Sequence, residues 1–309
     1  MANPSVGTIN GGQVIPDILE LVALGNEAVS KGSVYVIDGI QDKVSLPRLT
    51  NADDVLQNRQ AMPTTPSESL AYTERQIVPL DVMYYDKFNP RLFESVWREF
   101  QPQGALVDRV TDPEMQRAIL SVVSKSINKQ VGKLIWQGNT TLTTSLRFFN
   151  GFIPLMLADV AVTNPTPAGN ITESNVISIL DLVDTTIPNE LYDDPDMIIH
   201  MSTADFRKYQ NAVKNLSFKG QGPADVVPAI HKGREIRYYS GFPANYVLAC
   251  KASSSASSSL MAAVDMVNDP ENIKIERWRP EGEEFFIKVL FKMAVNYPFS
   301  QEIILFKPA

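Results

Sequence analysis

The chain has 309 residues, 44% of them hydrophobic, and a formal net charge of −7. This size allows a substantial core and two or three subdomains, and the acidic balance argues against a dedicated nucleic-acid-binding surface. No apolar run approaches the roughly 18 residues that span a bilayer, and the first residues lack the basic and apolar regions of a secretory signal. The single cysteine, Cys250, excludes an intramolecular disulfide, and its apolar, strand-like surroundings favour a packed thiol over a nucleophile.

The N-terminal residues 1–33 begin polar and then predict a short helix, opened by Pro16 and closed by Gly32. Such a helix is too short to be stable alone in water. We therefore expect it to dock on another part of the structure.

Residues 34–84 predict an extended, two-stranded arm. Residues 33–37, 43–49 and 72–82 have strand-like patterns, and a polar tip at about 50–69 contains Pro63 and Pro66. A tip of this length is unusual inside a compact domain and indicates a projecting functional loop. Because such an arm buries little of its own surface, its apolar residues need a partner outside the subunit.

A short helix is predicted at 88–100, and a far longer one at 112–137. Thr111 and Glu114 form a capping box for the long helix, and Gly138 marks its C-terminal end. Its apolar residues recur at three- and four-residue steps along one side: Ile119, Leu120, Val123, Ile127, Val131 and Leu134. At 1.5 Å per residue the helix is roughly 39 Å long, which suits a supporting helix that lies under a thin layer of structure.

The opposite side of the long helix is basic, with Arg117, Lys125, Lys129 and Lys133. The simpler interpretation is a solvated face that complements the helix macrodipole. A local basic contact surface on an otherwise acidic protein remains the alternative.

The centre of the chain, 139–265, alternates loops, helices and strands. Residues 139–170 are loop-rich, a helix opens at Thr172, and 197–201 predict a core strand followed by a helix capped by Ser202. Strands are predicted at 232–239 and 246–251, and the serine-rich segment 253–259 is expected to be a surface loop. Beyond it, strands at 272–279 and 283–295 are joined by a turn at 280–282, and a last strand follows at 301–307.

The sequence gives little support for catalytic activity. His200 and His231 have no partners at metal-ligand spacing, and the sequence has no phosphate-binding glycine loop and no nucleophile elbow. Acidic pairs occur at 53–54, at 193–196 and at 283–284, each in a predicted loop or turn where solvation explains them. We therefore expect no catalytic, cofactor-binding or metal-binding residues and no cofactor, so the protein is not expected to be an enzyme.

The order of elements resembles the tailed-bacteriophage major capsid protein family, whose fold encapsulin shells share. The long helix ends in Leu134-Ile-Trp-Gln-Gly138 before an Asn150-Gly151 segment, and residues 74–83 lead from the arm back into the body. The segments 233–249 and 265–275 are similar to the family's central strand pair and to its return strand. Each motif alone is weak, and the evidence is their order across some 270 residues.

The resemblance implies an α+β capsid fold with a fixed division of the chain. Residues 1–33 would be the N-terminal arm and 34–84 the extended loop. A peripheral domain would combine 85–138, including the spine helix, with 266–309, and an axial α/β domain would span 139–265. A hinge is expected where the loop joins the peripheral domain, at 86–89 and at residues 32–33.

The family's role implies a structural protein whose main partner is a second copy of itself. Its members self-assemble as pentamers and hexamers into an icosahedral shell that encloses double-stranded DNA, and the extended loop lies over a neighbouring subunit. A separate scaffolding protein, a portal and decoration proteins are further expected partners, with no membrane. The expected location is the virion capsid, assembled in the host cytoplasm. Because Lys43 lies at the loop's base and the tip has no lysine, no covalent crosslinking is predicted.

Two other functions remain open from the sequence. An encapsulin-like compartment would have the same fold and would hold an enzyme cargo in place of a genome. An enzyme of unrecognised type is the more distant alternative, and it would require a pocket with converging polar groups.

Overall fold

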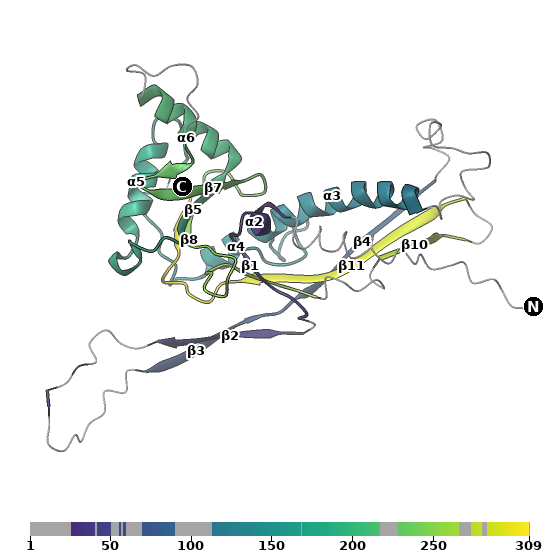
Figure 1. Cartoon of the computed structure of the whole chain (residues 1–309), viewed down its shortest axis with the longest axis horizontal. Coiled ribbons are helices and arrows are strands. Elements are labelled where there is room, and N and C mark those ends of the chain that lie inside the picture. Colours follow the sequence, from purple (N-terminus) through teal and green to yellow (C-terminus); the bar gives the residue numbers. More distant parts are fainter. Residues whose placement is uncertain are drawn as a thin grey trace, which may run out of the picture.

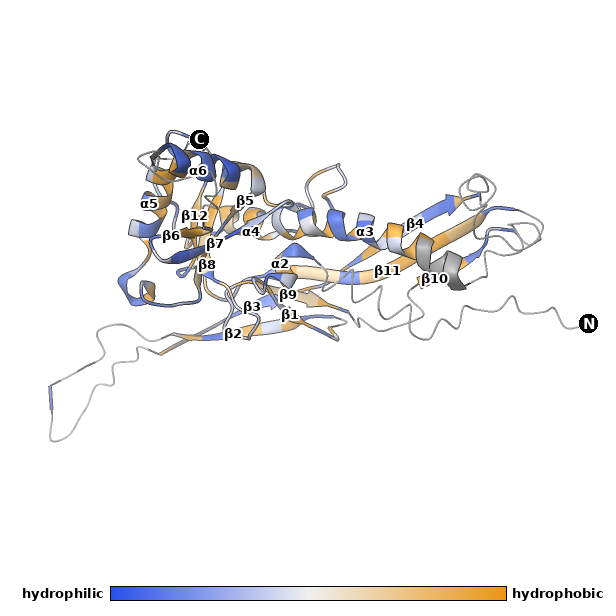
Figure 2. Ribbon diagram, turned by 45° about the horizontal axis from the view of Figure 1, so that its top comes forward, coloured by the Kyte–Doolittle hydropathy of each residue, from blue (hydrophilic) through white to orange (hydrophobic). Residues whose placement is uncertain are grey.

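The computed structural model describes residues 26–40, 42–50, 56, 58–59, 70–89, 113–167, 169–216, 228–265, 273–279 and 283–308. This part of the chain forms three units (Figure 1). An elongated lobe consists of the long helix α3 (Pro113–Gln137) lying along one sheet. A compact lobe carries α5 (Val176–Thr186) and α6 (Thr203–Leu216) on a second sheet. A two-stranded arm projects on the other side of the first sheet from α3, as Figures 1 and 2 both show.

The long helix α3, Pro113–Gln137, has nearly the predicted bounds. Its apolar side is buried, with Leu120, Val123, Ile127, Val131 and Leu134 all exposed by 9% or less. Lys125, Lys129 and Lys133 lie exposed on the other side. Gly138 follows the helix, and a larger residue would not fit there, because a Cβ would lie 2.3 Å from the carbonyl oxygen of Phe149.

The sheet of the elongated lobe packs its inner face against α3. Its strand order is β1-β9-β11-β10, and β4 pairs with β11 as well, along Phe285–Met293. β10 pairs with the first residues of β11 and β9 with the last ones. The strands are β1 Tyr35–Ile37, β4 Leu80–Phe88, β9 Met261–Val264, β10 Ile273–Arg277 and β11 Phe285–Asn296. Burial alternates along the first half of β11, where Phe285, Ile287 and Val289 are buried, whereas Met293, Ala294 and Val295 are buried in succession. Figure 2 shows apolar colouring along much of this strand.

The arm is the antiparallel pair β2, Val44–Thr50, and β3, Ala71–Ile77. The single returning strand expected at 72–82 is wrong, because β3 and β4 are separate strands on either side of Val78-Pro79. Pro79 has no N–H to continue the ladder, and β4 turns away to pair with β11. Residues 35–37 belong to the body as well, because β1 pairs in parallel with β9.

The compact lobe is built on the sheet β12-β8-β5-β7-β6. The predicted strand and capped helix are confirmed as β5, Met197–Ser202, and α6, Thr203–Leu216. The other elements are α5 Val176–Thr186, β6 Ile230–His231, β7 Arg234–Tyr239, β8 Val247–Lys251 and β12 Ile304–Phe306, with a short 3-10 helix at Asn189–Leu191. Because β12 pairs with β8, the last strand joins this sheet and not the one under α3.

Four elements of the described residues were not predicted, among them the two-residue strand β6 and the 3-10 helix at Asn189–Leu191. Helix α4, Phe152–Ala158, lies in the segment expected to be loop, and β9 lies between the serine-rich segment and Asp265. The serine-rich segment itself is only partly a surface loop, since Ser258 and Ser259 are fully buried.

Several predicted features fall outside the described residues. They include the start of the N-terminal helix at Pro16, the arm tip at 51–69 except residues 56, 58 and 59, and the capping residue Thr111. The helix at 88–100 apart from its first two positions and the turn at 280–282 also fall outside. Phe88 itself ends β4, so a helix starting there is wrong. Of the N-terminal helix, the structure describes α2, Glu27–Ser30, which Asn26 caps by accepting the Ala28 N–H at 2.9 Å. No helix of the described residues is long and apolar enough to cross a membrane.

Candidate functional site

His200 lies on β5 and is fully buried beside the rings of Trp136 and Tyr239. The Tyr239 hydroxyl donates to Ser33 Oγ at 2.6 Å, which leaves its oxygen to accept from His200 Nδ1 at 3.0 Å. Burial lowers the pKa of His200 to about 3, so the ring is neutral at physiological pH. A neutral histidine enclosed in this way is part of the packing between the two lobes.

The other sequence candidates are also held in structural contacts. His231 lies 3.0 Å from Asp181 of α5, through Nε2 and Oδ1. Cys250 is buried, as predicted, and burial raises the pKa of its thiol. In the acidic segment 193–196, Asp194 forms an ion pair with Lys251 at 3.0 Å. The described residues hold no group of three or more His, Cys, Asp or Glu side chains that could bind a metal ion.

A hollow of about 230 Å³ lies between the start of α2, the middle of α3 and the turn after β7. Lys125 and Lys129 line it, with Trp136 and Tyr239. Its carboxylate, Glu27, already accepts hydrogen bonds from the backbone N–H and the hydroxyl of Ser240, at 2.8 and 3.0 Å. The hollow therefore holds part of the predicted basic face, and its acidic group is engaged in joining α2 to the compact lobe.

The arm presents an apolar surface that sequence analysis anticipated. Leu49 and Tyr72 face each other across β2 and β3, and each is 64% exposed. Leu70, beside them, is 65% exposed. Large apolar side chains grouped on a projecting hairpin indicate a contact with another molecule.

A second exposed surface lies on the outer face of the elongated lobe's sheet. The rings of Tyr85, Phe286 and Trp278 lie within 6.2 Å of one another by centroid, and Lys87 Nζ lies 3.2 Å from the Trp278 ring centroid. Tyr85 and Trp278 are 41% and 43% exposed. Sequence reasoning missed this surface, although the polar and aromatic positions that alternate with the buried ones in β11 were the available signal.

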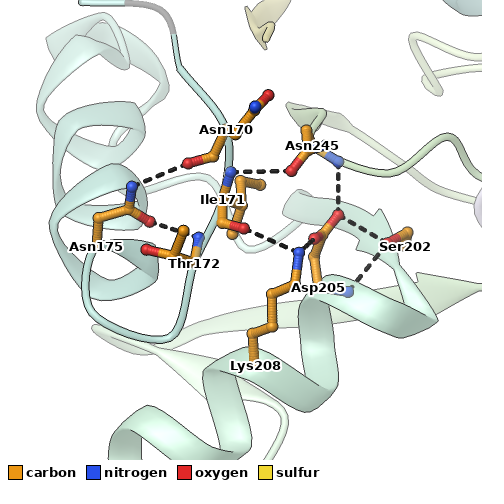
Figure 3. Close-up of polar contacts among 8 residues, drawn as sticks. All are labelled: Asn170, Ile171, Thr172, Asn175, Ser202, Asp205, Lys208 and Asn245. Carbon is orange, nitrogen blue, oxygen red and sulfur yellow. Dashed lines mark hydrogen bonds and ion pairs between the residues drawn. The ribbon is translucent and has the colours of Figure 1, made fainter.

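A network of hydrogen bonds holds the outer loops of the compact lobe together (Figure 3). Asp205 is fully buried and accepts from Ser202 Oγ, from the backbone N–H of Asn245 and from Lys208 Nζ. Lys208 also donates to the carbonyl of Ile171, and Asn245 accepts the Ile171 N–H. One carboxylate therefore joins α6, the turn before β8 and the loop that leads to α5.

Comparison with known proteins gives structural matches alone. No family model matches the sequence, and no curated protein sequence matches it. The capsid of the native GTA particle is similar with a TM-score of 0.57 and 12% identity, over 100% of this chain and 96% of that one. The cyanophage A-1(L) capsid has a TM-score of 0.56 and 10% identity, over 99% and 96% of the two chains. The virus-like particle from Pyrococcus furiosus has a TM-score of 0.54 and 10% identity, over 96% and 98%.

These comparisons define the fold of the protein. The chain has the mixed α+β capsid fold, and the match extends over nearly its whole length and nearly the whole length of each similar chain. The resemblance to tailed-phage capsid proteins that the order of elements predicts is therefore confirmed for the fold.

Proposed function

We propose that this protein is a major capsid subunit of a tailed bacteriophage. In this proposal it is a structural protein without catalytic activity, and its copies form pentamers and hexamers of an icosahedral shell around double-stranded DNA. The observation that carries the proposal is the arm, whose apolar pair Leu49 and Tyr72 is exposed on a hairpin that projects from the body. The full-length match to capsid structures supports it.

The proposed mechanism is multivalent assembly. An arm that reaches beyond its own subunit can bury its apolar face on a neighbour, and each subunit in a ring gives one arm and receives another. Each contact can be modest, because a subunit held by several neighbours at once is rarely lost from a closed shell.

In the proposed division of labour, residues 1–33 form the N-terminal arm and 34–84 the extended loop. The peripheral domain combines 85–138 with 266–309, and 139–265 form the axial domain. The pairings give two refinements to this proposal: β1 and β4 belong with the peripheral sheet, and β12 belongs with the axial sheet. A separate scaffolding protein, a portal and decoration proteins are the proposed partners. The proposed location is the virion capsid, built in the host cytoplasm.

An enzyme-holding compartment is the second candidate function. The similarity to the virus-like particle from Pyrococcus furiosus, which covers 98% of that chain, concerns the fold, and a shell of this fold is compatible with either content. The two functions share assembly and differ in what the shell encloses.

The test is electron microscopy of the purified full-length chain in negative stain, paired with light scattering. We expect rings, tubes or shells of megadalton mass. Nucleic acid or an enzyme copurifying from the native source then separates the capsid from the compartment. A chain that stays monomeric or dimeric across salt and concentration, alone and with the scaffolding protein from its own genome, contradicts the proposal.

A further inference from the structure

The arm meets the body at a narrow joint. At its base, Leu46 and Ile77 are buried in a small apolar cluster with Met261, Ala263 and Ala294. The side chain of Asn296 adds one hydrogen bond, from Nδ2 to the carbonyl of Gln76 at 2.9 Å. This cluster holds the foot of the hairpin, and it lies next to the strand break at Val78-Pro79.

Arg75 of β3, which is paired with Leu46, also contacts the body. Its Nη2 donates to Asp159, just after α4, and to Ser300 Oγ at 3.3 Å. Its guanidinium lies over the ring of Tyr297, 4.4 Å from the centroid, and the Tyr297 hydroxyl in turn donates to Asp159 at 3.0 Å. Although burial alone would raise the pKa of Asp159, the hydrogen bonds from Arg75, Ala161 N and Tyr297 hold that pKa below its ordinary value.

A second arginine, Arg48 of β2, makes a parallel contact. Its guanidinium lies 5.0 Å from the ring centroid of Phe299, and its Nη2 donates to Gln301 Oε1 at 2.8 Å. Both arginines thus rest on the same short segment, 297–301, which follows β11. Each contact combines a cation over an aromatic face with a hydrogen bond, which makes it directional.

These contacts hold the arm against the body, but they can be broken. The side chains of Arg75 and Asp159 are 32% and 18% exposed, so water can replace their ion pair. Nε of Arg48 is buried and has no hydrogen-bond partner among the described residues. An unsatisfied buried donor costs stability, so part of the energy of closing this contact is lost.

We propose that Arg48 and Arg75 form a latch on the segment 297–301 that fixes the arm at one angle, and that the arm swings about its apolar base when this latch opens. Residues 86–89 and 32–33, where the sequence suggested a hinge, are less suited to this movement. The first of these segments is paired with β11 through Asp86, Lys87 and Phe88. In the second, Ser33 is buried and accepts hydrogen bonds from Arg237 and Tyr239. The role of this movement in a shell rests on the proposed function: release of the latch lets identical subunits contact their neighbours at different angles.

The test measures the arm's angle directly in the unassembled full chain. Spin labels are placed at Leu49→Cys on the arm and Ser126→Cys on α3, while Cys250 is buried and escapes labelling. Double electron–electron resonance then gives the distance distribution between the two labels. We expect one narrow distribution for the parent chain and a broad or shifted one for R75A and for R48A/R75A.

Matched variants separate the latch from general effects. R59A removes the same charge from an exposed position of the same hairpin and should leave the distribution narrow. Y297F keeps the aromatic face and loses the hydroxyl, so it should broaden the distribution less than R75A does. A narrow, unshifted distribution in a folded R48A/R75A chain overturns the proposal, as does equal broadening in R59A. If R75A does not fold, Y297F and D159N provide the same comparison.

A second readout connects the latch to assembly. Shells or tubes formed by R75A should show a wider range of diameters than those of the parent chain and of R59A. An unchanged range of diameters, with the arm shown to be released, overturns the part of the proposal that concerns assembly. A parent chain that never assembles contradicts the proposed function and leaves the distance measurement valid.

Discussion

The buried carboxylate of Asp205 accepts the backbone N–H of Asn245 at 2.8 Å, across 40 residues of sequence. Asn245 has a φ of +65°, a left-handed conformation that Asn tolerates better than most residues, and its side chain accepts the N–H of Ile171. The pair therefore fixes a strained turn and a separate loop at the same point of the compact lobe.

Replacing Asp205 should destabilise the fold more than a typical substitution does. In D205A the Asn245 N–H and the Ser202 hydroxyl lose a buried acceptor, and the partly exposed Lys208 loses its ion pair. We expect a loss of about 3 kcal/mol in the free energy of unfolding. D205N keeps one acceptor oxygen and should lose less. Denaturant unfolding measures both, with the exposed Asp193→Ala as the control. A loss in D205A no greater than in D193A contradicts the interpretation.

Gly241 lies where the turn after β7 touches α3. A Cβ at this position would lie 2.2 Å from the carbonyl oxygen of Gly132, so G241A must push the turn away from the helix. We expect G241A to lose about 3 kcal/mol or more of stability. G169A is the matched control, because a Cβ there meets nothing within 4 Å. Equal melting temperatures for the two variants would show that the contact with α3 is dispensable.

His200 should make the fold sensitive to acid. Burial lowers the pKa of His200 from 6.5 to about 3 in the folded state, so the unfolded chain binds a proton first as the pH falls. The neutral ring's contribution to the free energy of unfolding is thus fully present above pH 6.5. That contribution is lost as the pH falls toward 3, at about 1.4 kcal/mol per pH unit. Stability curves of the parent chain and H200F should diverge in this window. H231Q, which keeps His200, should follow the parent, and parallel curves for all three contradict the assignment.

The apolar pair on the arm should matter for assembly and not for folding. Because Leu49 and Tyr72 are largely exposed, L49S/Y72S should change the free energy of unfolding by only about 0.5 kcal/mol. Particle formation, seen by light scattering and electron microscopy, should be lost. V160S is the matched control, since Val160 is 99% exposed but lies on the body. Normal particles from L49S/Y72S would remove the arm's apolar face from the mechanism.

Local patterns predicted the elements that have strong periodicity or clear end signals. The stripe on α3 and the cap at Ser202 depend on spacings of a few residues, and the structure confirms both. Helix α4 was missed because it is only seven residues long and has no side-chain cap at Gly151. Strand β9 was missed because Met-Ala-Ala-Val carries no period that separates it from a loop.

Amino-acid patterns alone were enough to predict a long one-sided helix, an extended arm with unpartnered apolar residues, and an order of elements typical of a capsid fold. The division of the strands between the arm and the body depends on folding, because Tyr35–Ile37 and Leu80–Phe88 are paired by partners about 200 or more residues away. Folding also sets the place where the arm joins the body. Arg48 and Arg75 look like ordinary strand residues in the sequence, and only folding places Tyr297 and Phe299 beneath them. Spacing along the chain encodes periodic faces and caps, whereas contacts between distant segments depend on how the faces pack.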